Sequence, residues 1–120
     1  ESDAVALAIE RASDDDIRTL RSMAEDATRQ RYAGSIADEL HLRIADLSGN
    51  PAIALFVRVL VHLTRLHASE TVVSTKERAF RSAGSGHAHD SIIEAIALRD
   101  TALARRRMLK HIELMAPVFR

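Results

Sequence analysis

The sequence lacks several residue types, and each absence excludes a class of protein. It has no cysteine, which excludes a disulfide framework, a cysteine-type zinc finger and thiol catalysis. It has no tryptophan, three phenylalanines and one tyrosine, so few rings are present to stack on nucleic-acid bases. It carries 17 Lys plus Arg against 17 Asp plus Glu, and this zero net charge argues against a stand-alone nucleic-acid binder.

Long apolar runs are absent as well. Residues 58–67 include two arginines and two histidines, and they interrupt the longest apolar stretch well short of the roughly 20 residues of a membrane span. With 47% apolar and 28% charged residues, the 120 residues suit one globular domain over 1–120. The chain opens with Glu1-Ser2-Asp3, without an initiator Met or a signal-peptide pattern. We therefore expect a fragment of a longer, cytoplasmic protein.

Glycine and proline are scarce, with four and two copies, whereas alanine and leucine are abundant, which favours helix from end to end. Residues 69–75 fit either a frayed helix end or a lone extended pair, and 82–86 form the most flexible stretch. Apolar periodicity predicts helices over residues 4–12, 14–31, 36–47, 51–68, 76–81, 87–98 and 101–115.

Capping residues mark several of these boundaries. Ser13 precedes three aspartates, a cap with an acidic first turn. Residues 32–35 predict a break between two helices, and Ser48-Gly49 predicts the end of the next one. Asn50-Pro51 predicts a new helix start, with a capping residue followed by proline at the first helical position. The helix after Pro51 is nearly all apolar, so we expect it at the centre of the fold. The prediction is an all-α, antiparallel helical bundle of six to seven helices.

The last two predicted helices carry the most chemical information. His89 lies eleven residues before Asp100, and His111 lies eleven residues after it. Asp100 itself is a suitable capping residue for the second of the two helices. A tight turn there folds the pair into a hairpin and sets the two imidazoles at one level. Ala95 and Ala104 are nearly symmetric too, and allow the helices a close approach. Two facing histidines can be ligands of a divalent metal, or hydrogen-bonded core or surface residues.

These positions resemble the closing segment of the FCD domain, the effector-binding domain of FadR-type regulators in the GntR family. That family has a His, an Ala six residues on, an Asp eleven on, an Ala fifteen on and a second His twenty-two on, and all five match here. A further match is Leu40-His41 followed by the run Ser48-Gly49-Asn50-Pro51. The front of the chain also follows the family's opening helices, at Glu1, Ala4, Leu7-Ala8, Glu10-Arg11-Ala12, Asp16 and Leu20.

The resemblance implies a metal-binding, ligand-sensing domain. Many members hold zinc or nickel through one Asp and three His, and the histidines correspond to His41, His89 and His111. The family's Asp position is occupied by Ala37, with Asp38 adjacent, three residues before His41. Asp38 is either a substitute ligand or a solvated surface acid. Three histidines alone can hold zinc with open positions, or line a metal-free polar cavity.

A second group of candidates lies on the apolar helix after Pro51. Arg58, His62 and Arg65 fall at i, i+4 and i+7, on one side of that helix. They are predicted effector-binding residues, since guanidinium groups pair bidentately with carboxylates. The alternative is a stripe that faces solvent or pairs with Asp or Glu inside the bundle. Catalysis is not expected, because the chain has neither a His-Glu-x-x-His motif nor a phosphate-binding Gly-rich loop.

The resemblance also implies a place in a larger regulator. We expect a homodimeric sensor domain that binds a small carboxylate metabolite, with a divalent metal, and so controls transcription. DNA binding would belong to a winged helix-turn-helix domain that precedes residue 1 and is absent from this chain. Two alternatives remain at this stage, a metal-free sensor of a fatty acid or acyl-CoA and a purely structural helical dimerisation module.

Overall fold

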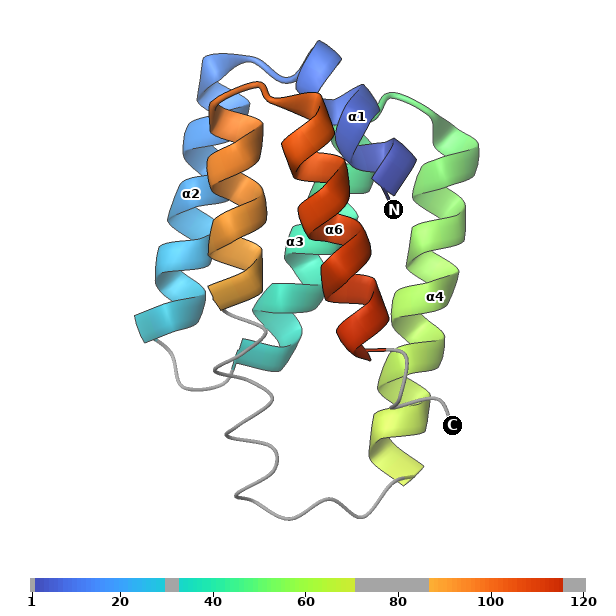
Figure 1. The fold of residues 1–120 in the computed structure, drawn as a ribbon. Helices are drawn as coiled ribbons and strands as arrows, with labels where there is room; N and C mark the ends of the chain where they lie inside the picture. Colours follow the sequence, from blue (N-terminus) through green and yellow to red (C-terminus); the bar gives the residue numbers. More distant parts are fainter. Residues whose placement is uncertain (1, 30–32, 71–86, 116–120) are drawn as a thin grey trace.

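The computed structural model describes residues 2–29, 33–70 and 87–115, and all regular secondary structure in these ranges is α-helix. The helices form an antiparallel bundle (Figure 1), which confirms the predicted fold class. The predictions for residues 32, 71–75, 76–81 and 82–86 lie outside the described residues. In chain order the helices are α1 (Ser2–Arg11), α2 (Asp14–Arg29), α3 (Ala33–Leu47), α4 (Pro51–Glu70), the helix of residues 87–97 and α6 (Thr101–Met115).

The start of α2 has the predicted cap. Ser13 Oγ accepts a hydrogen bond from the backbone amide of Asp16 at 3.1 Å, and Asp16 Oδ2 accepts one from the backbone amide of Ser13 at 3.0 Å. This reciprocal arrangement satisfies two amides that lack partners at a helix start. The same two groups of Ser13 hold the pKa of the Asp16 carboxyl below its ordinary value of 3.8, because both favour the ionised carboxylate.

The predicted break over residues 32–35 is wrong for its last three residues, because α3 already begins at Ala33. Gly34 and Ser35 therefore lie in the first turn of a helix. A glycine costs less there than in a helix interior, since the first-turn amides have no intrahelical partner to lose. The preceding helix is described as far as Arg29, and the last two residues of its predicted range, 30 and 31, lie outside the described residues.

The link between α3 and α4 follows the prediction closely. Gly49 adopts a φ of 69°, the left-handed conformation that ends many helices. A side chain at this position would also collide with the guanidinium of Arg11, which packs over it. Asn50 Oδ1 then accepts hydrogen bonds from the amides of Ala52 at 3.0 Å and Ile53 at 3.3 Å, and so caps α4.

The core lies between α1, α2, α3 and the last two helices. α1 packs against α3 and α6, while α2 and α4 each pack against α3. The largest fully buried apolar side chains come from four different helices, so the core ties them together. They are Val5, Leu20, Ile92, Ile96 and Met108.

The predicted central position of α4 is wrong. Figure 1 shows α4 at one edge of the bundle, where it packs mainly against α3. Among residues 51–67 of α4, whose side chains are described, Val57 and Val61 alone are buried, whereas several large apolar side chains are exposed. A helix that is apolar all round must be covered on both sides, but the sequence pattern does not say by what. None of the described helices combines the length and hydropathy needed to cross a membrane.

Candidate metal centre

The hairpin that carries two of the candidate ligands is closed by the turn at Arg99 and Asp100. The amide of Arg99 donates to the carbonyl of Ile96 (2.9 Å) and that of Asp100 to the carbonyl of Ala95 (3.1 Å). This pattern ends the helix of residues 87–97 with Arg99 in the left-handed region, at a φ of 53°. Asp100 Oδ1 accepts from the amide of Leu103 at 3.0 Å and caps α6, as predicted.

Arg99 fixes this hairpin to the rest of the bundle. Its guanidinium donates to the carbonyls of Ile9 at 2.8 Å and Ala12 at 2.9 Å, at the carboxyl end of α1. This role of Arg99 was not predictable from the sequence, because an arginine in a left-handed turn is not expected from its residue type. Ala95 and Ala104 are both fully buried in the same hairpin, as the predicted close approach requires.

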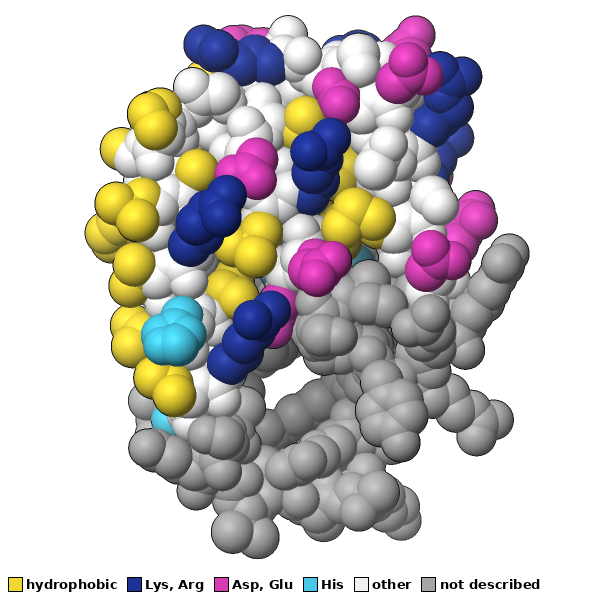
Figure 2. Space-filling view, turned by 180° about the vertical axis from the view of Figure 1, so that it is seen from behind, with side chains coloured by type: hydrophobic (Ala, Val, Ile, Leu, Met, Phe, Trp, Pro, Cys, Tyr) yellow, Lys and Arg dark blue, Asp and Glu magenta, His cyan; other side chains and the backbone are white. Residues whose placement is uncertain are grey.

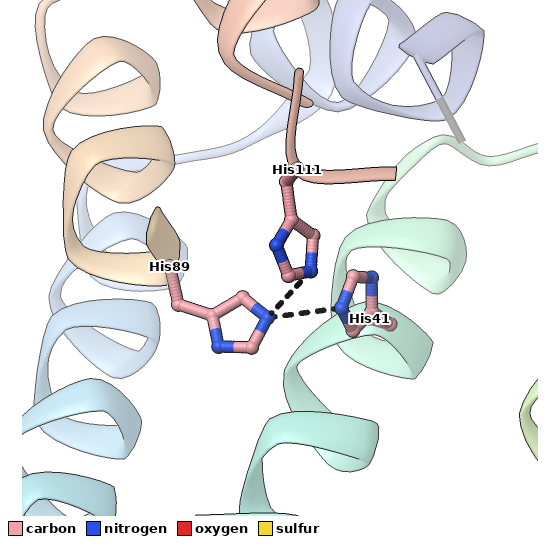
Figure 3. Close-up of side chains that lie close together, drawn as sticks. All are labelled: His41, His89 and His111. Atoms are coloured by element: carbon pink, nitrogen blue, oxygen red, sulfur yellow. Dashed lines mark hydrogen bonds between the residues drawn. The ribbon is translucent and has the colours of Figure 1, made fainter. Parts of the chain in front are cut away.

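The predicted meeting of His89 and His111 is confirmed. Their Nε2 atoms lie 3.2 Å apart, with His89 near the start of the 87–97 helix and His111 on α6. His41 joins them from α3, with its Nε2 3.0 Å from that of His89. Figure 3 shows the three rings, each from a different helix, with these nitrogens turned toward one another. A fold with antiparallel neighbours thus brings together residues that are 70 positions apart.

The rings are held in distinct orientations. His41 and His111 are nearly parallel, with an interplanar angle of 16° and centroids 5.4 Å apart. The His89 ring stands across both, at 79° to His41 and 66° to His111. His89 and His111 are 6% and 5% exposed, while His41 is half-buried, so solvent reaches the cluster at the His41 side.

The spacing of the nitrogens suits a metal ion. The ligand atoms of all three histidines lie within 4.8 Å of one another. Two nitrogens bound to a tetrahedral zinc at about 2.0–2.1 Å are themselves about 3.4 Å apart. The observed separations of 3.0 and 3.2 Å are close to that value. Small shifts of two side chains would therefore complete a three-nitrogen site.

The chemistry of the donors favours a cation as well. A neutral imidazole has one N–H donor and one lone pair, and three Nε2 atoms that face each other cannot all be satisfied by one another. If His89 Nε2 accepts from both neighbours, two N–H groups share a single lone pair. A divalent cation held by His41, His89 and His111 would take one lone pair from each ring, and the Nδ1 atoms would remain as donors. The residues present fit the metal that the resemblance implies.

Asp38, the fourth predicted ligand, lies one turn before His41 on α3 but is held elsewhere. Its Oδ2 accepts a hydrogen bond from Arg65 Nε of α4 at 2.7 Å, in an ion pair with side chains 22% and 50% exposed, respectively. The carboxylate is not part of the histidine cluster in this arrangement. The structure thus joins one predicted metal ligand to one predicted effector-binding residue.

The other two predicted effector-binding residues lie farther out on α4. Arg58 Nη2 donates to Asp46 Oδ1 of α3 at 2.8 Å, and both side chains are about half-exposed. His62 is exposed. Arg58 and Arg65 therefore adopt the pairing with bundle carboxylates that the sequence left open as an alternative, and the two ion pairs join α4 to α3.

The fold is thus an all-α bundle with three convergent imidazoles, two of them buried. The sequence model of the FCD domain family matches residues 1–114. The chain therefore belongs to the FCD domain family, the effector-sensing regulatory domains of GntR-family transcriptional regulators, as the resemblance had indicated. No curated protein and no solved structure matches the chain.

Proposed function

We propose that this domain senses a small carboxylate metabolite through a divalent metal held by His41, His89 and His111. The convergence of three Nε2 atoms from three helices carries the proposal, since it supplies a zinc-type or nickel-type donor set. When bound, the metal supplies a Lewis-acidic position open to an oxygen ligand. The half-buried His41 side is where an effector would enter.

Asp38 and Arg65 extend this site. Asp38 lies outside the histidine cluster while Arg65 holds its Oδ2 at 2.7 Å, so to serve as a fourth ligand its side chain would have to turn from Arg65 toward the histidines. The released guanidinium is then a bidentate partner for the effector's carboxylate. Of the three α4 residues predicted to bind effector, Arg65 is thus linked to the proposed metal site through its ion pair with Asp38. Arg58 and His62 would contact only an effector that extends along α4.

The regulatory part of the proposal concerns the whole protein. Two copies of the domain pair, and effector binding shifts the balance between two arrangements of the pair. A winged helix-turn-helix domain on each chain would read that change through the spacing of its half-sites on DNA. Such a regulator works in the cytoplasm and has no catalytic role.

Thermal unfolding with zinc tests the metal site. We expect zinc to raise the Tm of the unaltered domain and of His62→Ala, since His62 is exposed on α4 and outside the cluster. At a hundredfold excess over Kd the stabilisation is about 2.7 kcal/mol, or a rise of roughly 10 °C. His41→Ala, at the least buried ligand, should remove the response.

The effector is probed in the same experiment. Acetate and citrate added to the zinc-loaded domain should raise the Tm further and should have no effect on the zinc-free domain. A zinc response that is absent, or equal in His41→Ala and His62→Ala, would contradict the metal site. A carboxylate response without zinc would place the effector elsewhere.

A further inference from the structure

Helix α4 has two apolar sides, and the described part of the bundle covers one of them. Val57 and Val61 are buried, and with Ile53 they pack against Leu42 and Ala45 of α3. This contact accounts for one side of the helix. Most of the other large apolar side chains of α4 lie on the opposite half of the helical wheel and point away from α3, and Leu60 lies at the border between the two sides.

These outward side chains form one continuous strip, which we term the α4 seam. Figure 2 shows the hydrophobic side chains in a column along the edge of the molecule that α4 occupies. Their exposed fractions run from 41% to 69%, which is unusual for six large apolar residues on one helix. The α4 seam consists of Leu55, Phe56, Val59, Leu60, Leu63 and Leu66.

The spacing within the seam is that of a helix that packs on another helix. Phe56, Val59, Leu63 and Leu66 follow one another at intervals of three, four and three residues. This is the a/d repeat of a coiled coil over two heptads, and Leu55 and Leu60 flank it at neighbouring positions. A strip with this repeat packs best against a second helix with the same repeat.

The lack of charge along the seam suits a second copy of this chain as the partner. No Asp, Glu, Lys or Arg lies in the seam, so two copies can meet without like-charge repulsion. The two arginines of α4 are instead directed to α3, where Arg58 pairs with Asp46 and Arg65 with Asp38. A different partner selected by charge would find nothing in this strip to pair with.

The area is also adequate. At the exposed fractions observed, the six side chains offer on the order of 600 Å² of apolar surface, close to the ~800 Å² per partner of a standard interface. The surface continues into a mainly apolar groove of about 310 Å³ between α1 and α4, which Phe56 and Leu60 border together with Ala4 and Ile53. Its one acidic lining residue, Asp3, is paired with Arg105 of α6. Side chains from a facing helix can extend the contact into this groove.

We propose that the α4 seam is the surface through which two copies of this chain pair, α4 against α4 across a two-fold axis. The contact is isologous, since each copy offers the same strip. It assigns a surface to the pairing put forward under the proposed function, but it does not depend on bound metal. It also places the Arg65–Asp38 ion pair directly between the interface helix and the helix that carries His41.

Sedimentation equilibrium of three proteins tests this assignment. The unaltered domain should be a dimer at micromolar concentration, and Leu63→Glu should raise its dimer Kd by roughly 100-fold or more, as expected for a charge at the centre of an interface. Leu98→Glu is the matched control, because Leu98 is 67% exposed but lies in the hairpin turn, outside the seam. It should remain dimeric.

A monomeric unaltered domain, or equal dimer Kd values for Leu63→Glu and Leu98→Glu, would overturn the proposal. Unchanged helical circular dichroism of both variants excludes misfolding as the cause. The zinc response is measured on the same samples. A seam variant that becomes monomeric yet still binds zinc separates the two proposals, as does a dimer that binds none.

Cross-linking provides a second readout, since the chain has no cysteine of its own. The variant Val59→Cys/Leu63→Cys should form a disulfide-linked dimer under mild oxidation, whichever way the two helices run. Cysteines four residues apart on one helix do not readily join each other, so the product is intermolecular. Leu98→Cys should stay largely monomeric on denaturing gels. A cross-linked fraction no larger for the seam variant than for Leu98→Cys would also overturn the assignment.

Discussion

At the scale of single residues, the proposed metal site depends on which group the Asp38 carboxylate contacts. The family's acidic position holds Ala37, and the neighbouring Asp38 is engaged by Arg65 across the α3–α4 contact. Partly exposed ion pairs contribute little, about 0–1 kcal/mol, so this one can exchange for another partner. In the proposed site, a divalent cation with three imidazole ligands would offer Asp38 such an alternative.

The exchange predicts an unusual effect of one substitution. Arg65→Gln should strengthen zinc binding, by roughly 3–10-fold, because Asp38 no longer has to leave a cation. Asp38→Asn should weaken it by about tenfold or more, as expected for loss of a ligand. Isothermal titration calorimetry with zinc alone measures both, with Arg58→Gln as the matched control in the other α3–α4 ion pair.

Two results would contradict the exchange. If Arg65→Gln and Arg58→Gln bind zinc equally well, Arg65 does not restrain a ligand. If Asp38→Asn also leaves the affinity unchanged, the metal is held by three histidines with the remaining positions open. The histidine site survives this second result, whereas the role proposed for Asp38 does not.

At the scale of helices, the register of the last hairpin sets the distance between His89 and His111. Ala95 and Ala104 are both completely buried, and their small side chains permit the two helices of the hairpin to approach each other closely. Ala104→Leu should separate the helices, lower the stability by about 1–3 kcal/mol and weaken zinc binding, although residue 104 is not a ligand.

The control for that substitution is Ala102→Leu, on the exposed side of α6. It should leave both the free energy of unfolding and the zinc affinity near their original values. Denaturant unfolding and calorimetry on the two variants provide the comparison. Equal zinc affinity in Ala104→Leu and Ala102→Leu would show that the cluster does not depend on the hairpin register.

The cap of α2 predicts a pH dependence. The pKa of Asp16 is lowered by the amide and hydroxyl of Ser13, so the carboxylate stabilises the fold above its unfolded pKa and loses this effect as the pH falls through the folded value. Asp16→Asn should therefore have a lower Tm than the unaltered domain at pH 7, and the difference should shrink below about pH 4. A difference that stays constant from pH 7 to pH 3 would argue against this cap.

At the scale of the whole molecule, local sequence signals predicted most of the bundle. Ser13, Gly49, Asn50 and Asp100 act on their own helix ends, so their roles follow from residue type and spacing. The meeting of His89 and His111 followed from symmetry about one turn. The third ligand, His41, came only from the family resemblance, because no local rule relates α3 to the hairpin.

Long-range relations were not predictable in the same way. The apolar pattern of α4 is the same whether its second side is covered by its own bundle or by another molecule, so its edge position was missed. The partners of Arg58 and Arg65 depend on how α4 packs on α3, and the sequence left both solvent and bundle carboxylates open. The sequence pattern thus predicts which side of a helix is apolar or charged, whereas the residues that contact each side depend on how the helices pack.

The most direct test of the histidine metal centre is native mass spectrometry of the domain after incubation with zinc and removal of the excess. We predict a dimer mass that carries two zinc ions, with His62→Ala loaded equally and His89→Ala carrying none. Zinc absent from the unaltered domain, or present at the same stoichiometry in His89→Ala, would contradict the account.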